Sequence, residues 1–265
     1  MSEYKEVFKR TEIKYILTYD QYRKLLSYLS NIARIDQYGK TRINNIYFDT
    51  PDFSMIRTSL EKPLYKEKLR LRTYGRTGED TNSFIEIKKK FDGIVYKRRV
   101  SGSYRRAFDY LVNGAKPLDD SQISREIEGL KYVYDGLRPK MKICYDRIAL
   151  AGIEDPDFRV TFDTNIQWDT ESLDLTSDKC EHTILEEGRY MMEIKVANAM
   201  PKELSEKLSE FGIFPVSFSK YGRGYVDMVK MAAAESYEKP DVEVQETEMQ
   251  SHTYIRNLKG VTRYA

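Results

Sequence analysis

Charged and apolar residues alternate in four short stretches of this chain, so that a charge falls on every second position. The stretches are residues 10–14, 68–72, 86–90 and 193–195. Successive side chains of a β-strand point to opposite faces, so each stretch predicts a strand with one charged and one apolar face. Several such strands side by side would form a sheet with a dense positive field and a few carboxylates set into it.

The wider hydrophobic pattern predicts helices interspersed among strands. A helix capped by Thr18 is expected to run to about Ser30, because apolar residues recur there at helical spacing. Further helices are expected over 103–112, 121–134 and 221–234, and from Pro201 to a stop at Gly212. Strands are expected near 6–17, 42–49, 66–74, 83–90, 94–100, 139–150, 158–163 and 183–196. Because the strands follow one another as in hairpins, the pattern predicts an α+β fold on an antiparallel sheet, with or without closure into a barrel.

Length and composition limit the domains and the partners. The chain of 265 residues is long enough for one large domain, which we place at residues 1–234. From about Ser236 the composition shifts toward Glu, Pro, Asp and Gln, which predicts an acidic linker and C-terminal tail over 235–265. A net charge of only +2 argues against an RNA-binding module, so no nucleic-acid partner is expected.

Several kinds of chemistry lack the residues that they need. Only two histidines are present, which disfavours a zinc site or a histidine-dependent triad, and no phosphate-binding glycine loop occurs. The two cysteines, Cys144 and Cys180, form no disulfide framework, which predicts a reduced, cytoplasmic protein. No apolar run approaches the roughly 20 residues that span a bilayer, and the first residues do not resemble a signal peptide, so direct membrane insertion is not expected.

A single charged strand face is most simply solvated, but the number and type of charges here favour a binding site. Arg70 and Arg72 are arginines, which suit bidentate contacts with phosphate. Helices that cover the apolar face would leave the charged face pointing into a groove or barrel. A cluster of like charges there needs an anion to neutralise it. Glu12, Glu86 and Glu193 could orient the basic groups or hold Mg²⁺ or Mn²⁺.

Asp49 and Trp168 are expected to have structural roles. Asp49 follows a predicted strand and precedes Thr50-Pro51, so capping of this turn is favoured slightly over a place in the site. Trp168 is expected in the core or on the surface rather than as a platform for a base.

Nine segments, taken together and in this order, resemble the triphosphate tunnel metalloenzymes, and within them the catalytic domain of the vacuolar transporter chaperone (VTC) polyphosphate polymerases. The segments cover about residues 8–230: RTEIKY (10–15), IYFDT (46–50), KLRLRTYG (68–75), FIEIKKK (84–90), VYKRRV (95–100), YDRIAL (145–150), FRVTFDT (158–164), MEIKV (192–196) and FSKYGRGY (218–225).

The resemblance implies an eight-stranded antiparallel β-barrel with helices packed outside, whose tunnel binds a triphosphate. It also implies a metal-dependent transferase that moves the γ-phosphate of ATP to a growing polyphosphate chain, with Mn²⁺ or Mg²⁺ as cofactor and Glu193 as metal ligand. The basic residues that would bind phosphate in one enclosed space are Lys14, Arg70, Arg72, Lys88, Lys97, Arg147, Arg159 and Lys220.

Two departures from the family pattern bear on the activity. The related CYTH branch opens with Glu-x-Glu-x-Lys, whereas Arg10 stands first here, which favours the polymerase branch and removes one metal ligand. Ser59 stands where the polymerases carry a further arginine, and Lys66 or Lys68 could compensate.

The residues leave two alternatives to a polymerase open. These are an inorganic tripolyphosphatase or nucleoside triphosphatase, and a non-catalytic polyphosphate sensor. The eukaryotic relatives are fused to membrane-spanning segments, so a separate membrane protein is a conceivable partner if the product is exported. The sequence does not indicate the base preference, the acceptor or the oligomeric state.

Overall fold

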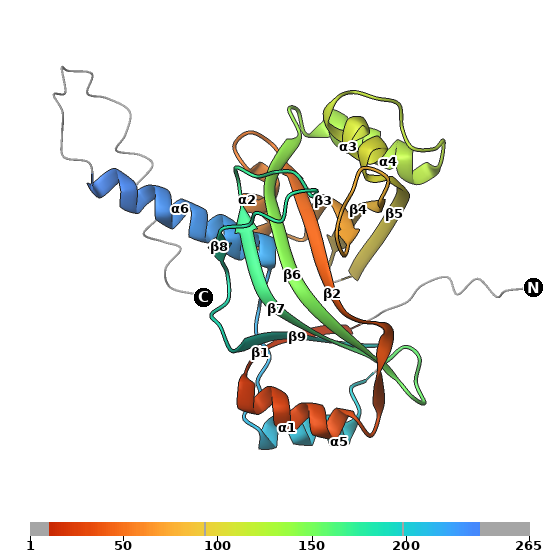
Figure 1. Cartoon of the computed structure of the whole chain (residues 1–265), viewed down its shortest axis with the longest axis vertical. Coiled ribbons are helices and arrows are strands. Elements are labelled where there is room, and N and C mark those ends of the chain that lie inside the picture. The colour runs from red at the N-terminus through yellow and green to blue at the C-terminus, as the bar shows by residue number, and fades with distance from the viewer. Residues whose placement is uncertain (1–10, 93, 198, 239–265) are drawn as a thin grey trace, which may run out of the picture. The chain divides into compact units, whose positions relative to one another are not determined.

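The computed structural model describes residues 11–92, 94–197 and 199–238 (Figure 1). Its strands are β1 (Thr11–Thr18), β2 (Ala33–Asp49), β3 (Tyr65–Tyr74), β4 (Asn82–Phe91), β5 (Ile94–Ser103), β6 (Arg138–Gly152), β7 (Arg159–Asp169), β8 (His182–Thr183) and β9 (Arg189–Val196). Its helices are α1 (Tyr19–Leu29), α2 (Ser54–Leu60), α3 (Tyr104–Val112), α4 (Gln122–Val133), α5 (Lys202–Glu210) and α6 (Lys220–Glu238). The chain divides into two units, Met1–Asp227 and Met228–Ala265, and the sheet belongs to the first. Most of the predicted tail and Arg10 lie outside the described residues.

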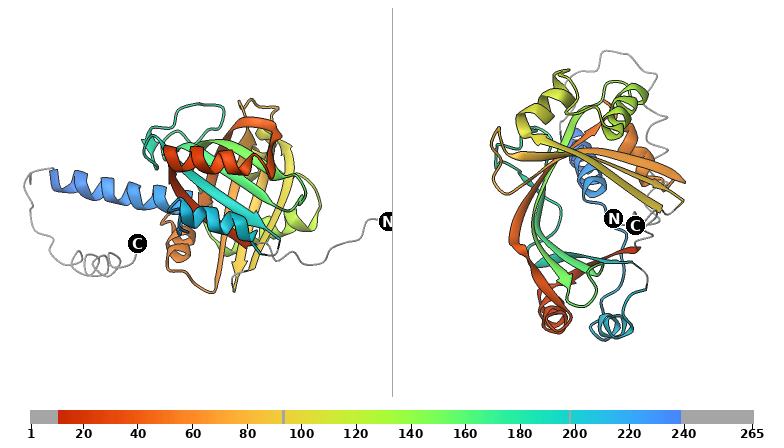
Figure 2. Two further views of the ribbon diagram at one scale, coloured as in Figure 1. Left: turned by 90° about the horizontal axis from the view of Figure 1, so that it is seen from below. Right: turned by 90° about the vertical axis from the view of Figure 1, so that its right-hand side faces the viewer.

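All strands belong to one antiparallel sheet of nine strands, which confirms the α+β class. The order is β1-β9-β7-β6-β2-β3-β4-β5, and the short β8 pairs with β7. The sheet curls, so that β3, β4 and β5 lie across from β1 and β9 (Figure 2, right). The expected closed barrel of eight strands is wrong, because the edge strands β1 and β5 do not pair with each other in the described part of the chain.

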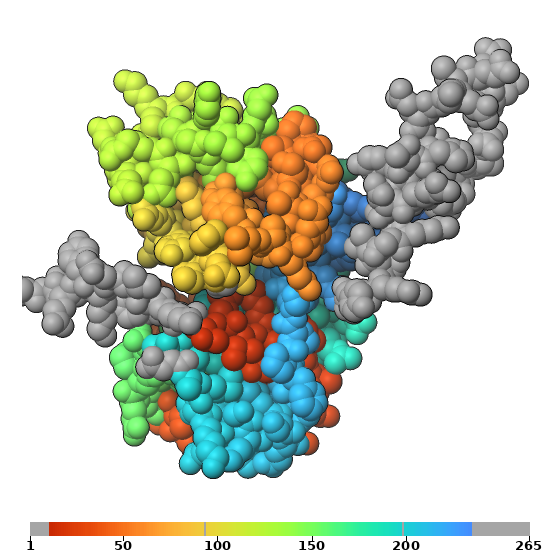
Figure 3. Space-filling view, turned by 180° about the vertical axis from the view of Figure 1, so that it is seen from behind, coloured from red at the N-terminus to blue at the C-terminus, as the bar shows by residue number. Residues whose placement is uncertain are grey.

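The outer edge of β1 pairs at one point with another segment of the chain. The backbone N–H of Val216 donates to the carbonyl of Lys14 at 2.8 Å, and Tyr15 and Pro215 form a β-bridge. The backbone groups used in this pairing are not available to a further strand at that point. We call residues 215–220 the strap. In the view from behind, this light-blue chain runs beside the red β1 and up to the orange region around β3 (Figure 3).

Two apolar clusters bury the outer face of the curled sheet under helices. Leu25 and Leu29 of α1, with Leu204 and Leu208 of α5, pack on one half. α3 and α4 pack on the other half, over apolar side chains of β3, β4 and β5. Each fully buried aliphatic side chain contributes about 1.5–3 kcal/mol of transfer free energy. This burial fixes which face of every strand points outward, and therefore leaves the charged face inside.

Local signals account for most element boundaries, and the exceptions have local causes. Thr18 caps α1 in a capping box with Gln21, as expected. Asp49 is confirmed as a cap, since its carboxylate accepts the N–H groups of Met55 and Ile56 at the start of α2, a helix that the pattern did not predict. The run expected at 183–196 is broken into β8 and β9 by a turn with Gly188 at φ +76°.

Candidate functional site

The strand register places charged residues from seven strands on one face, which we call the inner face. Lys88 pairs with Lys97 and Lys68, and Glu86 pairs with Arg70 and Arg99. Of the predicted site residues, the inner face carries Lys14, Arg70, Arg72, Lys88, Lys97, Arg147, Arg159 and Glu193. Lys220 opens α6, and its Nζ reaches this face at 2.6 Å from Asp163. The architecture thus brings together residues that are up to about 200 positions apart.

Glu86 lies at the centre of the first cluster. Its side chain is 1% exposed, and its oxygens lie 2.6 Å from Arg70 Nη2 and 2.6 Å from Lys97 Nζ, with Arg72 Nη1 at 3.6 Å. Burial raises the pKa of Glu86, but these three cations outweigh it and lower the pKa to about 2. Glu86 is therefore a permanent carboxylate, and its three cation partners suit a role in orienting basic groups better than metal binding.

Three uncharged side chains hydrogen-bond to the two arginines of this cluster. The alternation of charges in the sequence did not point to two of these partners, Asn45 and Tyr47. Tyr47 Oη accepts from Arg70 Nη1 at 3.0 Å, and Asn45 Oδ1 accepts from Arg72 Nε at 2.8 Å. Arg72 Nη2 also donates to Tyr145 Oη at 3.2 Å. Asn45 and Tyr47 alternate on β2 as strand neighbours of Arg72 and Arg70, but without a charge this spacing is a weak signal. These contacts fix the guanidinium planes in advance of any ligand.

Asp163 organises a second cluster on β6, β7 and α6. Arg147 binds it in a bidentate manner, with Nε 2.6 Å from Oδ1 and Nη2 2.8 Å from Oδ2. Lys220 Nζ lies 2.6 Å from the same Oδ2 and 4.5 Å from the ring centre of Tyr145. Burial raises the pKa of Asp163, but Lys220 and Arg147 outweigh this effect, lower the pKa and hold the carboxyl ionised. One carboxylate thus positions two predicted phosphate-binding cations.

Glu193 and Glu12 form a third cluster on β9 and β1. Glu193 Oε1 lies 2.6 Å from Lys195 Nζ, and burial of its carboxyl is outweighed by Lys195 and Lys14, which lower its pKa. Glu12 lies 3.3 Å from Lys14 Nζ and 3.6 Å from Lys88 Nζ on the facing strand β4. Burial raises the pKa of Glu12 and so does the nearby Glu193, but the surrounding lysines lower it overall. Two ionised carboxylates are thus held close to each other.

This pair fits the donors that Mg²⁺ or Mn²⁺ prefers. Magnesium commonly binds one or two protein carboxylates and completes its coordination with water and substrate phosphates. No group of three His, Cys, Asp or Glu side chains suited to a metal occurs among the described residues. Glu193 and Glu12 are therefore the residues that would hold a metal, and phosphate oxygens and water would supply its remaining ligands.

The strap closes the open side of the inner face through two lysines. Lys14 Nζ donates to the carbonyl of Phe218 at 3.0 Å, and Lys68 Nζ donates to Ser219 Oγ at 3.1 Å. The strap thereby contacts both the edge strand β1 and the inner strand β3. Lys66 and Lys68, the two lysines that could compensate for the arginine replaced by Ser59, have different partners. Lys66 Nζ donates to the carbonyl of Ser59 at 3.2 Å, whereas Lys68 Nζ contacts the strap.

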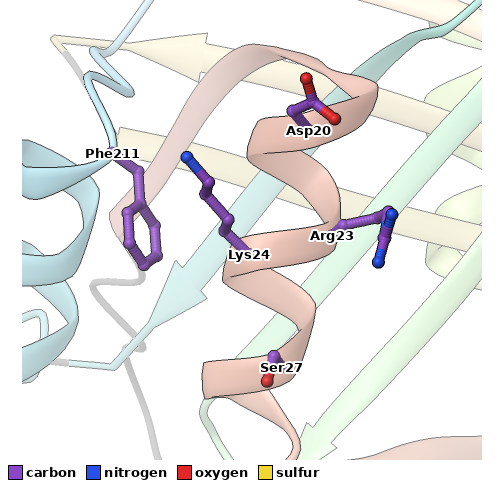
Figure 4. Close-up of a pocket in the computed structure, with 5 residues that line it drawn as sticks. All are labelled: Asp20, Arg23, Lys24, Ser27 and Phe211. Atoms are coloured by element: carbon purple, nitrogen blue, oxygen red, sulfur yellow. The ribbon is translucent and has the colours of Figure 1, made fainter.

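Arg159 lies at the rim of the inner face. Its side chain is 49% exposed and its Nη2 lies 3.4 Å from Asp36 of β2. Its strand partner on β9 is Lys195, the lysine that pairs with Glu193, so Arg159 lies beside the third cluster with its side chain largely exposed. A separate surface hollow is lined by Asp20, Arg23, Lys24 and Ser27 of α1, and by Phe211 (Figure 4). It contains no predicted site residue.

The charge of the inner face predicts how anion binding varies with pH. Burial lowers the pKa values of Lys68 and Lys97 to about 8. Burial raises the pKa of Tyr47, but Arg70 and Arg72 reverse this and bring it to about 8. As pH rises from 7 to 9, the lysines lose positive charge and the tyrosine gains negative charge. We therefore expect affinity for sulfate, whose charge is constant in this range, to fall several-fold in a calorimetric titration. Constant affinity up to pH 9 would contradict these assignments.

The comparisons with known proteins agree with this geometry. A family model described as the VTC domain matches residues 9–229. The chain belongs to the VTC domain family. This confirms the resemblance drawn from the nine segments and places the curled sheet among the triphosphate tunnel folds. No curated protein matches the chain significantly.

Two solved structures resemble this VTC domain. A Bacillus halodurans protein described as a "putative adenylate cyclase" has a TM-score of 0.50 and 16% identity, and the match covers 78% of this chain and 92% of that one. This likeness shows the fold alone. A Vibrio parahaemolyticus protein with the same description has a TM-score of 0.45 and 11% identity over 81% of this chain and 96% of that one, too low to infer a shared fold. Within the described residues, no helix is both long and apolar enough to cross a bilayer.

Proposed function

We propose that this VTC domain binds the triphosphate of ATP on its inner face and transfers the γ-phosphate to a growing polyphosphate chain. The observation that carries this proposal is the excess of cations over carboxylates on an inward-facing surface. Glu86 is shared by three cations and Asp163 by two, so much positive charge is left to be neutralised by a ligand. A ligand with several phosphates supplies such charge in a compact form.

The chemistry expected of this site is positioning and charge neutralisation. Arg70 and Arg72, already fixed by Glu86, Tyr47 and Asn45, would orient non-bridging phosphate oxygens. Arg147 and Lys220 would neutralise charge that develops during transfer. Glu193 and Glu12 would hold Mn²⁺ or Mg²⁺, which when bound supplies further neutralisation of the phosphate oxygens. The acceptor is the terminal phosphate of a polyphosphate chain, and ADP leaves.

A hydrolase would use the same binding face with water in place of the acceptor phosphate. The direct test is incubation of the full chain with ATP and Mn²⁺, followed by separation of the products. Long acid-labile phosphate chains are expected for a polymerase, whereas free phosphate would indicate a triphosphatase. Binding of ATP without either product would support a sensor.

Tripolyphosphate is expected to stabilise the protein against heat, because it relieves repulsion among the inner-face cations. At about 100 times the dissociation constant, a ligand specific for the folded state contributes roughly 2.7 kcal/mol. Arg72→Ala is expected to weaken this binding about tenfold or more, since it removes a fixed bidentate donor. Arg98→Ala is the matched control, because Arg98 belongs to β5 but pairs with Glu126 on the outer face. Equal increases in melting temperature with tripolyphosphate for Arg72→Ala and Arg98→Ala would show that Arg72 does not contribute to the site.

A further inference from the structure

The inner face continues beyond the three clusters along the β3–β4 hairpin. Lys66 and Lys90 are strand partners, one step past the pair Lys68 and Lys88. Since side chains two residues apart share a face, both lysines extend the same basic surface. We propose that Lys66 and Lys90, with the adjacent Lys62, form a second anion subsite that binds phosphates of a polyphosphate chain beyond the first three. This inference rests on the proposed function and deepens it.

The ion pairing of the three subsite lysines resembles that of Lys68, whose ammonium donates to Ser219, and differs from that of three neighbouring lysines. Lys88 pairs with Glu12, Lys89 with Glu126 and Lys97 with Glu86. Among the described residues, no carboxylate forms an ion pair with the three subsite lysines. The Lys66 ammonium donates instead to a neutral carbonyl, that of Ser59.

The strand register places Lys66 opposite Lys90, and the Lys66 ammonium reaches the carbonyl of Ser59, three residues before Lys62. Burial lowers the pKa of Lys66, and Lys90 and Lys62 lower it further. Lys62 has φ +56° directly after Glu61, the C-cap of α2, which is the left-handed position at which many helices end. An uncompensated group of lysines is most readily balanced by an anion.

The length of the basic surface favours a chain of phosphates over a single triphosphate. Arg72, Arg70, Lys68 and Lys66 follow one another at every second position of β3. At about 6.8 Å for each two-residue step, they cover roughly 20 Å. A triphosphate held at Arg70 and Arg72 has only three phosphorus atoms and would leave the Lys66 end free.

The test compares a short and a long ligand on the full chain. Lys66→Ala/Lys90→Ala is expected to leave the affinity for tripolyphosphate within about twofold of wild type. Its affinity for long-chain polyphosphate is expected to fall about tenfold, with the slope of log Kd against log salt reduced by about 0.7 for each lysine removed. Lys179→Ala/Lys202→Ala is the matched control, since it removes two exposed lysines that pair with Glu181 and Glu206.

Each other outcome has a distinct meaning. Unchanged affinity of the double variant for long chains would overturn the subsite, as would an equal loss for both ligands, which would assign the lysines to the triphosphate site or to folding. Displacement of long-chain polyphosphate by single-stranded RNA of equal charge would overturn the assignment to a phosphate chain. Failure of the wild type to bind tripolyphosphate would instead contradict the proposed function. Lys66→Arg/Lys90→Arg is expected to retain wild-type affinity, because the charge is kept.

Discussion

Glu193→Gln is expected to abolish turnover while leaving the binding of triphosphate intact. The substitution removes one of two neighbouring carboxylates that would hold the metal, together with a negative charge beside the anion site. We expect kcat with ATP and Mn²⁺ to fall at least about 100-fold, as when one stabiliser of developing charge is lost. In the presence of EDTA, the Kd for tripolyphosphate is expected to be equal to or lower than that of wild type.

The control for this experiment is Glu206→Gln, which changes an exposed carboxylate of α5 that pairs with Lys202. If Glu193→Gln retained the wild-type rate with Mn²⁺, the metal role would pass to Glu12. Glu86 is not a substitute, because three cations already enclose it.

Glu86→Gln is expected to destabilise the fold by about 3–5 kcal/mol, the range typical of breaking a buried ion pair by removing one partner. Arg70, Arg72 and Lys97 would then face one another without the carboxylate that separates them. Urea unfolding with and without tripolyphosphate measures this effect. Because the ligand supplies negative charge to the same cations, we expect it to stabilise the variant more than it stabilises wild type.

Glu126→Gln is the matched control, since Glu126 pairs with Lys89 and Arg98 on the outer face of the same hairpin. Glu126→Gln is expected to lower the free energy of unfolding by at most about 1 kcal/mol, as for other partly exposed ion pairs. A Glu86 variant as stable as this control would show that the arginines are held without their carboxylate.

The lowered pKa of the Glu86 carboxyl predicts that acid decreases the free energy of unfolding. The folded pKa of Glu86 is about 2, below the ordinary value of 4.5, so its stabilisation is fully present above pH 4.5 and is lost as pH falls toward 2. A shift of this size corresponds to about 3 kcal/mol. The difference in free energy of unfolding between wild type and Glu86→Gln is therefore expected to shrink over this range.

Alternation of charged and apolar residues was enough to identify most of the candidate site. Arg70, Arg72, Glu86 and Lys88 could be assigned to one face because the side-chain period of a strand is two, and because helices had to cover the apolar positions between them. The family was recognisable for the same reason, since its motifs are these alternating strands in a fixed order.

Only the tertiary structure showed what surrounds these charges and how the sheet ends. Asn45 and Tyr47 are uncharged, so their bonds to the arginines depend on the pairing of β2 with β3, which strand periodicity does not specify. The role of Glu86, a carboxylate like Glu12 and Glu193 in the sequence, was decided by the cations packed around it. The barrel that the resemblance implied is open in the structure, and residues 215–220, distant in the chain, pair with part of the β1 edge. Local periodicity determines the face on which a side chain lies, whereas its partner across the fold depends on long-range contacts that no local pattern encodes.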